Sequence, residues 1–493
     1  MATGGDIPEV PARPDEGDRP RVGVDEWVAS VEDRREERAG IAGLARRVDD
    51  VVPSWARLAA FGAVAASLPL WMDRGDLFAY GIFTLIYVLL GLGLNVVVGY
   101  AGLLDLGYVA LFGFGAYFYA LLSSEHYGIH WPSWVTFPVV VLSTALLGLV
   151  LGVPSRRLLG DYLAIVTLFF GQAFVVFVNA ANPTVRGQGL TGGPNGIADI
   201  DANDLFGYEL TTRRQQYWFI LGVVLLVLTG LHFLSESRTG RAWRALREDP
   251  LAAEAMSIPV NRLKLMAFAF GAGIAGLTGC MFAAVLTAVT SGNFALPILI
   301  TIYAVVILGG IGSLTGVVIG AIVINVSFQF LAPENPQDNA RILFYAVVVL
   351  LLVIGIRPWW RLGAVLAGVL ALGVVAHTVA EAVSPSWTAG AVVEGGRLSG
   401  VVSDWVIIPA GHDRFAPAAY IGLIVAILAL TRIRGWWRTG LLIPTVYLSA
   451  IVWETSFVEQ PAVARWILFG ALLVFLMTVR PQGLLGTPRV EIV

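Results

Sequence analysis

Few residues of this sequence have the types and spacing that chemistry requires. The HExxH and GxSxG sequences and a paired set of catalytic carboxylates are missing. Lys264 is the only lysine and lies outside any G-x-x-x-x-G-K-[ST] sequence, so the chain has no phosphate-binding loop for nucleotide hydrolysis. Cys280, the only cysteine, lies within an apolar block, which favours a small buried side chain over a reactive thiol. An enzyme is therefore the least favoured class of function.

The longest charged segment between apolar blocks spans residues 236–258. Residues 239–248 are mostly good helix formers, and their charged and alanine-rich positions fall on different faces of a helix. Asp249 and Pro250 predict the N-cap and first residue of a second short helix that ends near Met256. Two such helices could form a docking surface, although the charge pattern alone also fits a solvated loop.

His377 and Glu381 are ionisable residues inside an apolar segment, about one helical turn apart on the same face. Such a pair fits a proton relay in an ion-coupled transporter. Their position near the end of the segment favours ordinary placement at a membrane interface instead.

The elements that carry these residues are apolar. The 493 residues are 57% hydrophobic and 14% charged, whereas soluble domains have about 25% charged residues. The predicted fold class is therefore all-α, a polytopic transmembrane helical bundle of about 11 to 14 apolar segments, some of them broken or re-entrant. The predicted segments are 56–72, 77–99, 108–124, 134–153, 162–180, 217–234, 263–289, 294–309, 314–331, 342–356, 362–382, 416–432, 439–455 and 465–479.

Arginine placement indicates the orientation of these segments, because basic residues near span ends stay on the cytoplasmic side. With a cytoplasmic amino terminus and every segment crossing, most dense arginine clusters fall inside, including 238–247 and 432–438. The polar stretches 182–215 and 384–415 then fall outside. The net charge of −3 and the lack of a basic, aromatic-rich surface pattern argue against nucleic-acid binding.

The first 54 residues are acidic and rich in proline near the start, which predicts a largely disordered cytoplasmic tail. Residues 24–45 also fit a short amphipathic helix on the membrane surface, but a solvated tail is the favoured interpretation.

Glycine-rich sequences predict where spans are interrupted. Gly309, Gly310 and Gly312 permit a break between two half-spans. Such a break is tolerated in a membrane where it lines an aqueous path along which a substrate crosses. Each glycine alone fits close helix packing equally well. Residues 100–107 similarly predict a turn or a re-entrant piece, in which Asp105 either faces a path or caps the next helix.

Several spaced blocks resemble, in order, the permeases of the branched-chain amino-acid ABC transporter family, and within it the M-type subunit. The segment R-A-L-R-E-D-P-L-A-A-E-A-M-S-I is similar to that family's cytoplasmic coupling loop. The other matching blocks are G-L-G-L-N-V-V-V-G-Y-A-G-L-L-D-L-G at 91–107, G-D-Y-L-A-I-V-T-L at 160–168, L-T-G-G-P-N-G-I at 190–197, G-G-I-G-S-L-T-G at 309–316 and R-P-Q-G-L-L-G at 480–486.

The resemblance implies a non-catalytic permease subunit of an importer in the cytoplasmic membrane of a prokaryote. It implies no cofactor on this chain, with ATP and Mg bound by a partner. The implied partners are a second permease subunit, two ATPase subunits, an extracytoplasmic substrate-binding protein and membrane lipid, without nucleic acid. The implied substrates are branched-chain or other hydrophobic amino acids. Urea or short-chain amides are the alternative substrates, and an ion-coupled secondary transporter is the alternative class.

The resemblance also assigns candidate site residues. Those of the coupling loop, within 236–261, are Arg241, Arg244, Arg247, Glu248, Asp249, Glu254 and Ser257. An amino acid needs donors for its carboxylate and acceptors for its ammonium, which helix termini and free carbonyls also supply. The candidates along the path are Asn95, Asp105, Thr167, Gln172, Thr191, Asn195, Gly309, Gly310 and Gly312.

The sequence departs from the family in four residues and in having extra helices before its R-P-Q-G-L-L-G end. The family usually has glycine, serine, histidine and an acidic residue at the positions of Ser257, Asp105, Tyr108 and Gln172, respectively. The predicted core domain spans 55–345, extra helices with an outer loop at 384–415 span 346–463, and a terminal helix with the R-P-Q-G-L-L-G end spans 464–493. The sequences that begin A-R at 340 and 464 and end R-P at 357 and 480 echo each other, which fits duplication of a terminal helix or independent helix stops.

Overall fold

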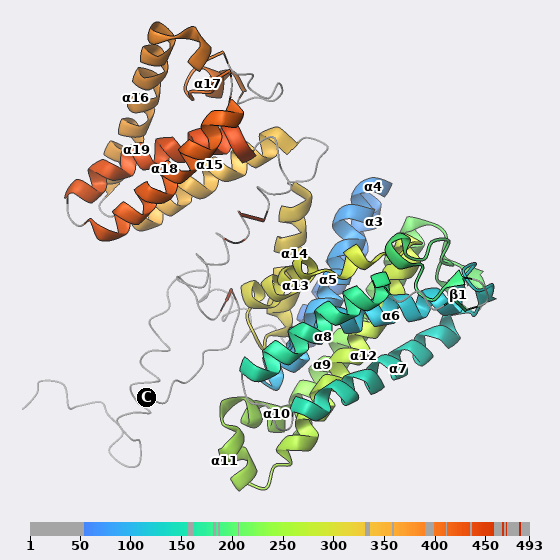
Figure 1. Ribbon diagram of the computed structural model, residues 1–493. Helices are drawn as coiled ribbons and strands as arrows, with labels where there is room; N and C mark the ends of the chain where they lie inside the picture. Colours follow the sequence, from blue (N-terminus) through green and yellow to red (C-terminus); the bar gives the residue numbers. More distant parts are fainter. Residues whose placement is uncertain are drawn as a thin grey trace, which may run out of the picture. The chain divides into compact units, whose positions relative to one another are not determined.

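The computed structural model describes residues 54–155, 161–180, 184–185, 188–205, 207–330, 336–356, 359–389, 399–410, 412–433, 436–457, 466–467, 470 and 483–484 (Figure 1). The chain divides into residues 1–60 and residues 61–493, and the features below belong to the second unit except for the first residues of α3. The predicted tail helix at 24–45 lies outside the described residues.

Every apolar segment predicted between residues 56 and 455 corresponds to a helix, which confirms an all-α fold. In the described part of the chain, eight helices are long and apolar enough to cross a membrane. Of the last predicted segment, 465–479, only Trp466, Ile467 and Gly470 are described. The longer helices are α3 (Ser54–Trp71), α5 (Phe83–Leu94), α6 (Tyr108–Leu122), α7 (Ser133–Ser155), α8 (Asp161–Ala180), α9 (Arg213–Glu236), α12 (Val260–Leu286), α13 (Leu296–Gly309), α14 (Leu314–Phe330), α15 (Pro336–Gly355), α16 (Trp359–Val383), α18 (His412–Arg432) and α19 (Trp436–Val452).

Short elements connect these helices. The three antiparallel hairpins pair β1 (Ser123–Ser124) with β2 (Ile129–His130), β3 (Thr184–Val185) with β4 (Gln188–Gly189), and β5 (Asp204–Leu205) with β6 (Tyr208–Glu209). The short helices are α4 (Arg74–Asp76), η1 (Leu77–Ile82), η2 (Asn95–Tyr100), η3 (Gly193–Asn195), α10 (Arg238–Glu248), α11 (Pro250–Ala255), η4 (Ser291–Phe294), η5 (Pro385–Trp387), α17 (Ser399–Ser403) and η6 (Trp453–Phe457).

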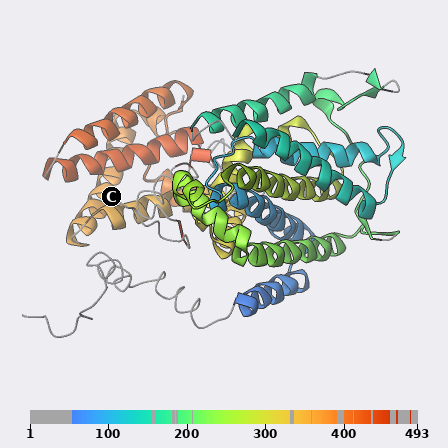
Figure 2. The same ribbon diagram turned by 90° about the horizontal axis from the view of Figure 1, so that it is seen from below.

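Helix α12 lies at the centre of the core, packed against α5, α6 and α7 (Figures 1 and 2). Small residues allow this close approach. A Cβ atom on Gly115 would lie 2.5 Å from the Cα of Gly276, and one on Gly279 would lie 2.5 Å from the carbonyl oxygen of Phe112. Since lipid gives no hydrophobic drive between helices, such close backbone packing is a main source of their association. The 27 residues of α12 span about 40 Å, so its two ends mark opposite ends of the core.

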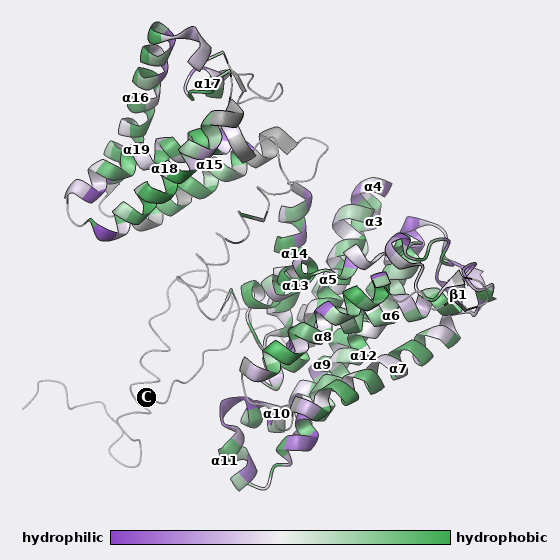
Figure 3. Cartoon of the chain, in the orientation of Figure 1, coloured by the Kyte–Doolittle hydropathy of each residue, from purple (hydrophilic) through white to green (hydrophobic). Residues whose placement is uncertain are grey.

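Hydropathy separates the middle of the core from its ends (Figure 3). Hydrophobic residues cover the long helices, whereas polar residues gather around α10 and α11 at one end and around β1 at the other. We call these the α10–α11 end and the hairpin end.

Two helices that run toward the α10–α11 end stop at glycine-containing turns, which we call the two breaks. The second break joins two antiparallel helices, α13 and α14, since Gly309 packs on Gly316 and Gly320 packs on Val305. The helix that begins at Arg74 becomes a π-helix at Asn95–Tyr100 and stops, and residues 101–107 are not helical. Helices α13 and α14 are separated at residues 310–313, where Gly310 and Gly312 have φ angles of 115° and 90°. Residues other than glycine rarely adopt these φ angles, which explains why glycine occupies the break.

Helices α15, α16 and α19 and residues 402–408 share a second hydrophobic cluster. Within it, Arg341 and Glu454 form an ion pair with a distance of 2.9 Å between Nη2 and Oε2, and their side chains are only 0% and 1% exposed. Phe344 stacks on Trp453 with ring centroids 4.4 Å apart. The first of the two echoing sequences therefore belongs to this cluster.

The second echoing sequence contacts other residues. The Trp466 ring lies 5.6 Å from that of Phe328 in α14. Further along, the amide of Leu484 donates to the carbonyl of Leu308 in α13 at 2.9 Å. Gly483 has a φ angle of 75°, and a Cβ there would lie 2.7 Å from the Cα of Gly310. The described part of R-P-Q-G-L-L-G therefore packs on the break between α13 and α14.

Candidate functional site

The α10–α11 end carries the helical hairpin that the sequence predicts. Ser237 caps α10 by accepting a hydrogen bond from the amide of Gly240. Asp249 caps α11 by accepting from the amides of Leu251 and Ala252 at 2.8 and 3.1 Å. These caps satisfy amide groups that a helix start leaves without partners, so both short helices have defined first turns.

Helix α10 is held through its buried face. Trp243 and Leu246 are buried, and the indole nitrogen of Trp243 donates to the carbonyl of Leu263 in α12 at 2.9 Å. The charged face predicted from the sequence, Arg241, Arg244 and Glu248, is exposed. Arg241 and Arg244 nevertheless donate to the carbonyls of Glu236 and Ser235 at the end of α9.

Helix α11 exposes large apolar side chains in this polar region. Leu251 is 79% exposed and Met256 is 78% exposed, and Glu254 beside them is also exposed. A groove of about 360 Å³ adjoins them, lined by residues between 254 and 265. Exposed apolar residues on a polar surface are typical of a protein interface.

Ser257 directly follows this hairpin and has a φ angle of 63°. A side chain is disfavoured in this left-handed conformation, whereas glycine adopts it freely. The local geometry explains why glycine is usual at this position in the resembling permeases.

Arg247 points differently from the other arginines of α10. Its Nη1 donates to the carbonyl of Gly99, at the end of η2, at 2.7 Å. This contact was not predicted, because nothing in the local sequence separates Arg247 from Arg244.

The candidate path residues fall into separate places. Asn95 is buried, and its Oδ1 accepts from the amide of Gly312 at 2.8 Å, so these two candidates meet at the breaks. Asp105 and Thr167 lie close to each other. Asp105 Oδ1 accepts from the Gly107 amide just before α6, and Thr167 Oγ1 accepts from the amide of Leu106, both at 2.9 Å.

The remaining path candidates are not joined to these. Thr191 is buried at the hairpin end and donates to the carbonyl of Val178 at 2.7 Å. Asn195 is exposed in η3, and Gln172 is exposed on α8. Gly309 packs against Gly316 across the break in α13–α14. The predicted candidates therefore do not form one site. Asn95, Gly310 and Gly312 nevertheless lie together at the two breaks.

His377, one of the ionisable pair in α16, contacts a residue of the second hydrophobic cluster. The Nδ1 atom of His377 lies 3.3 Å from the carbonyl oxygen of Val406, and Glu381 is exposed.

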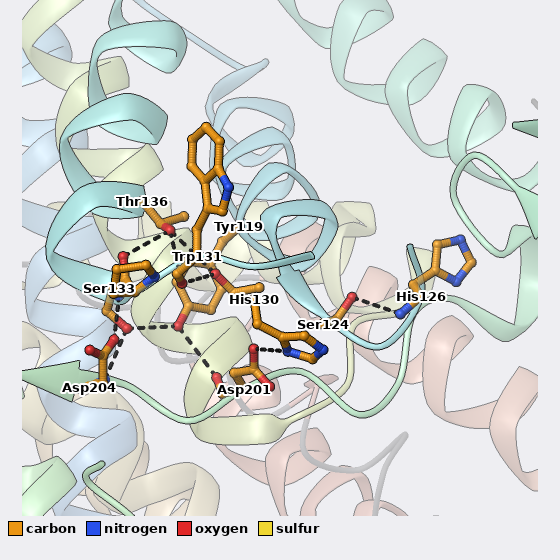
Figure 4. Close-up of polar contacts among 11 residues, drawn as sticks. Tyr119, Ser124, His126, His130, Trp131, Ser133, Thr136, Asp201 and Asp204 are labelled. Carbon is orange, nitrogen blue, oxygen red and sulfur yellow. Dashed lines mark hydrogen bonds and ion pairs between the residues drawn. The ribbon is translucent and has the colours of Figure 1, made fainter. Parts of the chain in front are cut away.

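The hairpin end contains a polar network that sequence reasoning missed (Figure 4). His130 Nδ1 lies 2.7 Å from Asp201 Oδ2, and Asp204 accepts from the amide of Ser133. The hydrogen bond and negative charge of Asp201 raise the pKa of His130 above its ordinary value of 6.5. The network joins the β1–β2 hairpin to a loop about 70 residues away, so only a three-dimensional contact could reveal it.

Apolar helices of spanning length with a polar helical hairpin at one end define a multi-pass membrane protein. A family described as "Branched-chain amino acid transport system / permease component" matches residues 77–353, more than half of the chain. The chain belongs to this family and is a permease subunit of an ABC importer.

Individual relatives agree. The high-affinity branched-chain amino acid transport system permease protein LivM of Escherichia coli K12 is 36% identical over 319 residues, covering 60% of this chain and 72% of LivM. LivH of Salmonella typhimurium is 23% identical over 281 residues, covering 54% of this chain and 89% of LivH. A probable LivM of Methanocaldococcus jannaschii is 23% identical over 233 residues, covering 43% of this chain and 65% of that protein. No solved structure gives a significant match to this chain.

Proposed function

We propose that this chain passes branched-chain or other hydrophobic amino acids across the cytoplasmic membrane, driven by ATP hydrolysis on a separate subunit. The observation that carries the proposal is the α10–α11 hairpin, with Leu251 and Met256 exposed at one end of an otherwise apolar core. The similarity to LivM, whose name states branched-chain amino acid transport, supports the substrate class.

In this proposal the α10–α11 end is cytoplasmic and the hairpin end faces outward. The arginines between 238 and 247 support this orientation, because basic loop residues stay inside. The partners are a second permease subunit, two ATPase subunits and an extracytoplasmic substrate-binding protein. This chain does no covalent chemistry and holds no cofactor, while ATP and Mg are bound by the ATPase subunits.

The docking surface follows from the same hairpin. Leu251 and Met256 would insert into a groove on the ATPase, while the exposed charges of α10 surround the contact. Burial of two large apolar side chains would contribute about 1.5 to 3 kcal/mol each to assembly. The ATPase would have to contact this surface differently in its ATP-bound and ATP-free states, because a ligand shifts an equilibrium only by its differential affinity.

Co-purification and uptake test the proposal. The double variant L251D/M256D should lose the ATPase subunits and ATP-dependent uptake of labelled leucine, since each change places a carboxylate in the apolar contact. Val401, which is 68% exposed on α17, provides the matched control V401D, which should retain both properties. Undiminished assembly and uptake by L251D/M256D would contradict the docking assignment.

Competition identifies the substrate. Excess leucine, isoleucine and valine should each reduce the uptake of labelled leucine, whereas urea and acetamide should not. Uptake of urea without uptake of leucine would assign the alternative substrate class. Leucine uptake that follows an ion gradient and ignores ATP would assign a secondary transporter.

A further inference from the structure

The break after η2 and the break between α13 and α14 are in direct contact. Asn95 begins η2, and its Oδ1 accepts a hydrogen bond from the amide of Gly312 at 2.8 Å. A Cβ on Gly99 would lie 2.8 Å from that same amide nitrogen and would also meet the Asn95 carboxamide. The end of η2 and the break between α13 and α14 are therefore locked together without room for another side chain.

Arg247 of α10 reaches this junction. Its Nη1 donates to the carbonyl of Gly99 at 2.7 Å. A Cβ on Gly312 would lie 2.7 Å from the same Nη1 atom, and one on Gly102 would lie 3.0 Å from the Cγ atom of Arg247. Gly99, Gly102 and Gly312 therefore lie around the side chain of Arg247. They belong to η2, to the residues that follow it and to the break between α13 and α14.

The chemistry of this contact favours a cation. Gly99 lies in the last turn of η2, where carbonyl groups have no further amide to accept from within the helix. The negative end of the helix dipole falls at the same place, and it is stabilised by a positive side chain. A guanidinium is always charged and carries five N–H donors, so it satisfies such a carbonyl more strongly than a neutral donor does.

Arg247 lies near the end of a short capped helix. This helix is capped at Ser237, and its 11 residues form three helical turns that end one residue after Arg247. A displacement of α10 must therefore either pull on Gly99, and through Asn95 and Gly312 on the second break, or rupture a charge-assisted hydrogen bond.

We propose that Arg247 is the positioning residue that transmits movement of α10 to both breaks at once. This inference rests on the proposed function, because it assigns the route by which the ATPase acts on the path. In this proposal Arg241 and Arg244, on the exposed face of α10, meet the partner. Arg247 instead meets the two breaks. The two breaks then change together rather than independently.

The coupling ratio tests the role of Arg247. The assembled transporter is reconstituted in proteoliposomes with its ATPase subunits and binding protein, and the leucine moved per ATP hydrolysed is measured. The variant R247Q should lower this ratio about tenfold, within the usual range of coupling between sites. The variant R247K should recover part of it, because an ammonium can still donate to the Gly99 carbonyl.

Arg213 offers a matched control at the hairpin end. Its Nη1 also donates to a backbone carbonyl near the end of a helix, that of Val285 in α12, at 2.9 Å. The variant R213Q removes the same kind of bond away from the breaks and should keep the wild-type ratio within about twofold. A wild-type ratio in R247Q, or an equal loss in R213Q and R247Q, would overturn the inference.

A second variant covers the case in which R247Q fails to assemble. N95A leaves Arg247 in place but removes the acceptor of the Gly312 amide, so it should also lower the ratio. Wild-type coupling in N95A would refute the link between the two breaks. The proposed function fails if the wild-type complex shows no ATP-dependent uptake. If the wild-type complex does show this uptake and R247Q keeps the wild-type coupling ratio, only the inference is contradicted.

Discussion

The Arg341–Glu454 ion pair makes a strong prediction about stability. Arg341 Nε donates to both Glu454 oxygens at 3.2 and 3.0 Å, and Tyr345 donates to one of them at 3.4 Å. Both charged side chains are almost fully buried, so neither can turn to water when its partner is lost. The variants R341M and E454Q should therefore each lower the free energy of unfolding by about 3 to 5 kcal/mol.

The double variant sharpens the test. R341M/E454L replaces both charges with apolar side chains, and such a replacement of a buried pair is often neutral or stabilising. The double variant should lose much less free energy of unfolding than the two single variants lose together. Each single variant mainly measures the cost of an unpaired buried charge. The gap between the sum and the double variant measures the coupling between the two side chains.

The assay is unfolding of the purified protein in mild detergent by titration with a denaturing detergent, followed by tryptophan fluorescence. His232 and Glu236 supply a control, since this pair is 3.5 Å apart and 33% and 65% exposed. E236Q should change stability by no more than about 0.5 kcal/mol. Single variants at Arg341 and Glu454 that resemble E236Q, or a double variant that loses the full sum, would refute the reasoning.

Two further predictions concern the ends of the core. S257G should stabilise the protein by about 1 kcal/mol, because it relieves a side chain at a φ angle of 63°; thermal unfolding measures the gain, and a destabilised S257G would contradict it. Because Asp201 raises the pKa of His130, their pairing is complete below about pH 6.5 and is lost as pH rises through the raised pKa. The variant D201N should therefore reduce the fall in melting temperature between about pH 6 and pH 9, and an unchanged fall would exclude this pair as its source.

Local sequence predicted the features that have local causes. Runs of apolar residues predicted the longer helices, such as α7, α9 and α12, because a span of the bilayer needs about 20 apolar residues. Asp249 followed by Pro250 predicted the start of α11, since a cap acts within three residues. Gly310 and Gly312 predicted the break between α13 and α14, because glycine adopts the positive φ angles found there.

Contacts between distant residues were not predictable in this way. Arg247 meets Gly99 across 148 residues, and Arg341 meets Glu454 across 113. No property of the residues next to Arg341 in the sequence reveals a buried carboxylate partner. Such pairings depend on how the helices pack, which the spacing of residues in one segment does not fix.

The contact of Leu484 with α13 has a consequence for biosynthesis. The carbonyl of Leu308 lies at a helix end, where it needs a partner from outside the helix, and the amide of Leu484 supplies it. About 175 residues separate the two, and at about 5 to 20 residues per second the ribosome needs roughly 10 to 35 s to make them. During that interval the helices from α15 to α19 enter the membrane while the glycine break lacks one of its hydrogen bonds. This hydrogen bond therefore forms only after α15 to α19 have been synthesised, and a chain released before Leu484 would lack it.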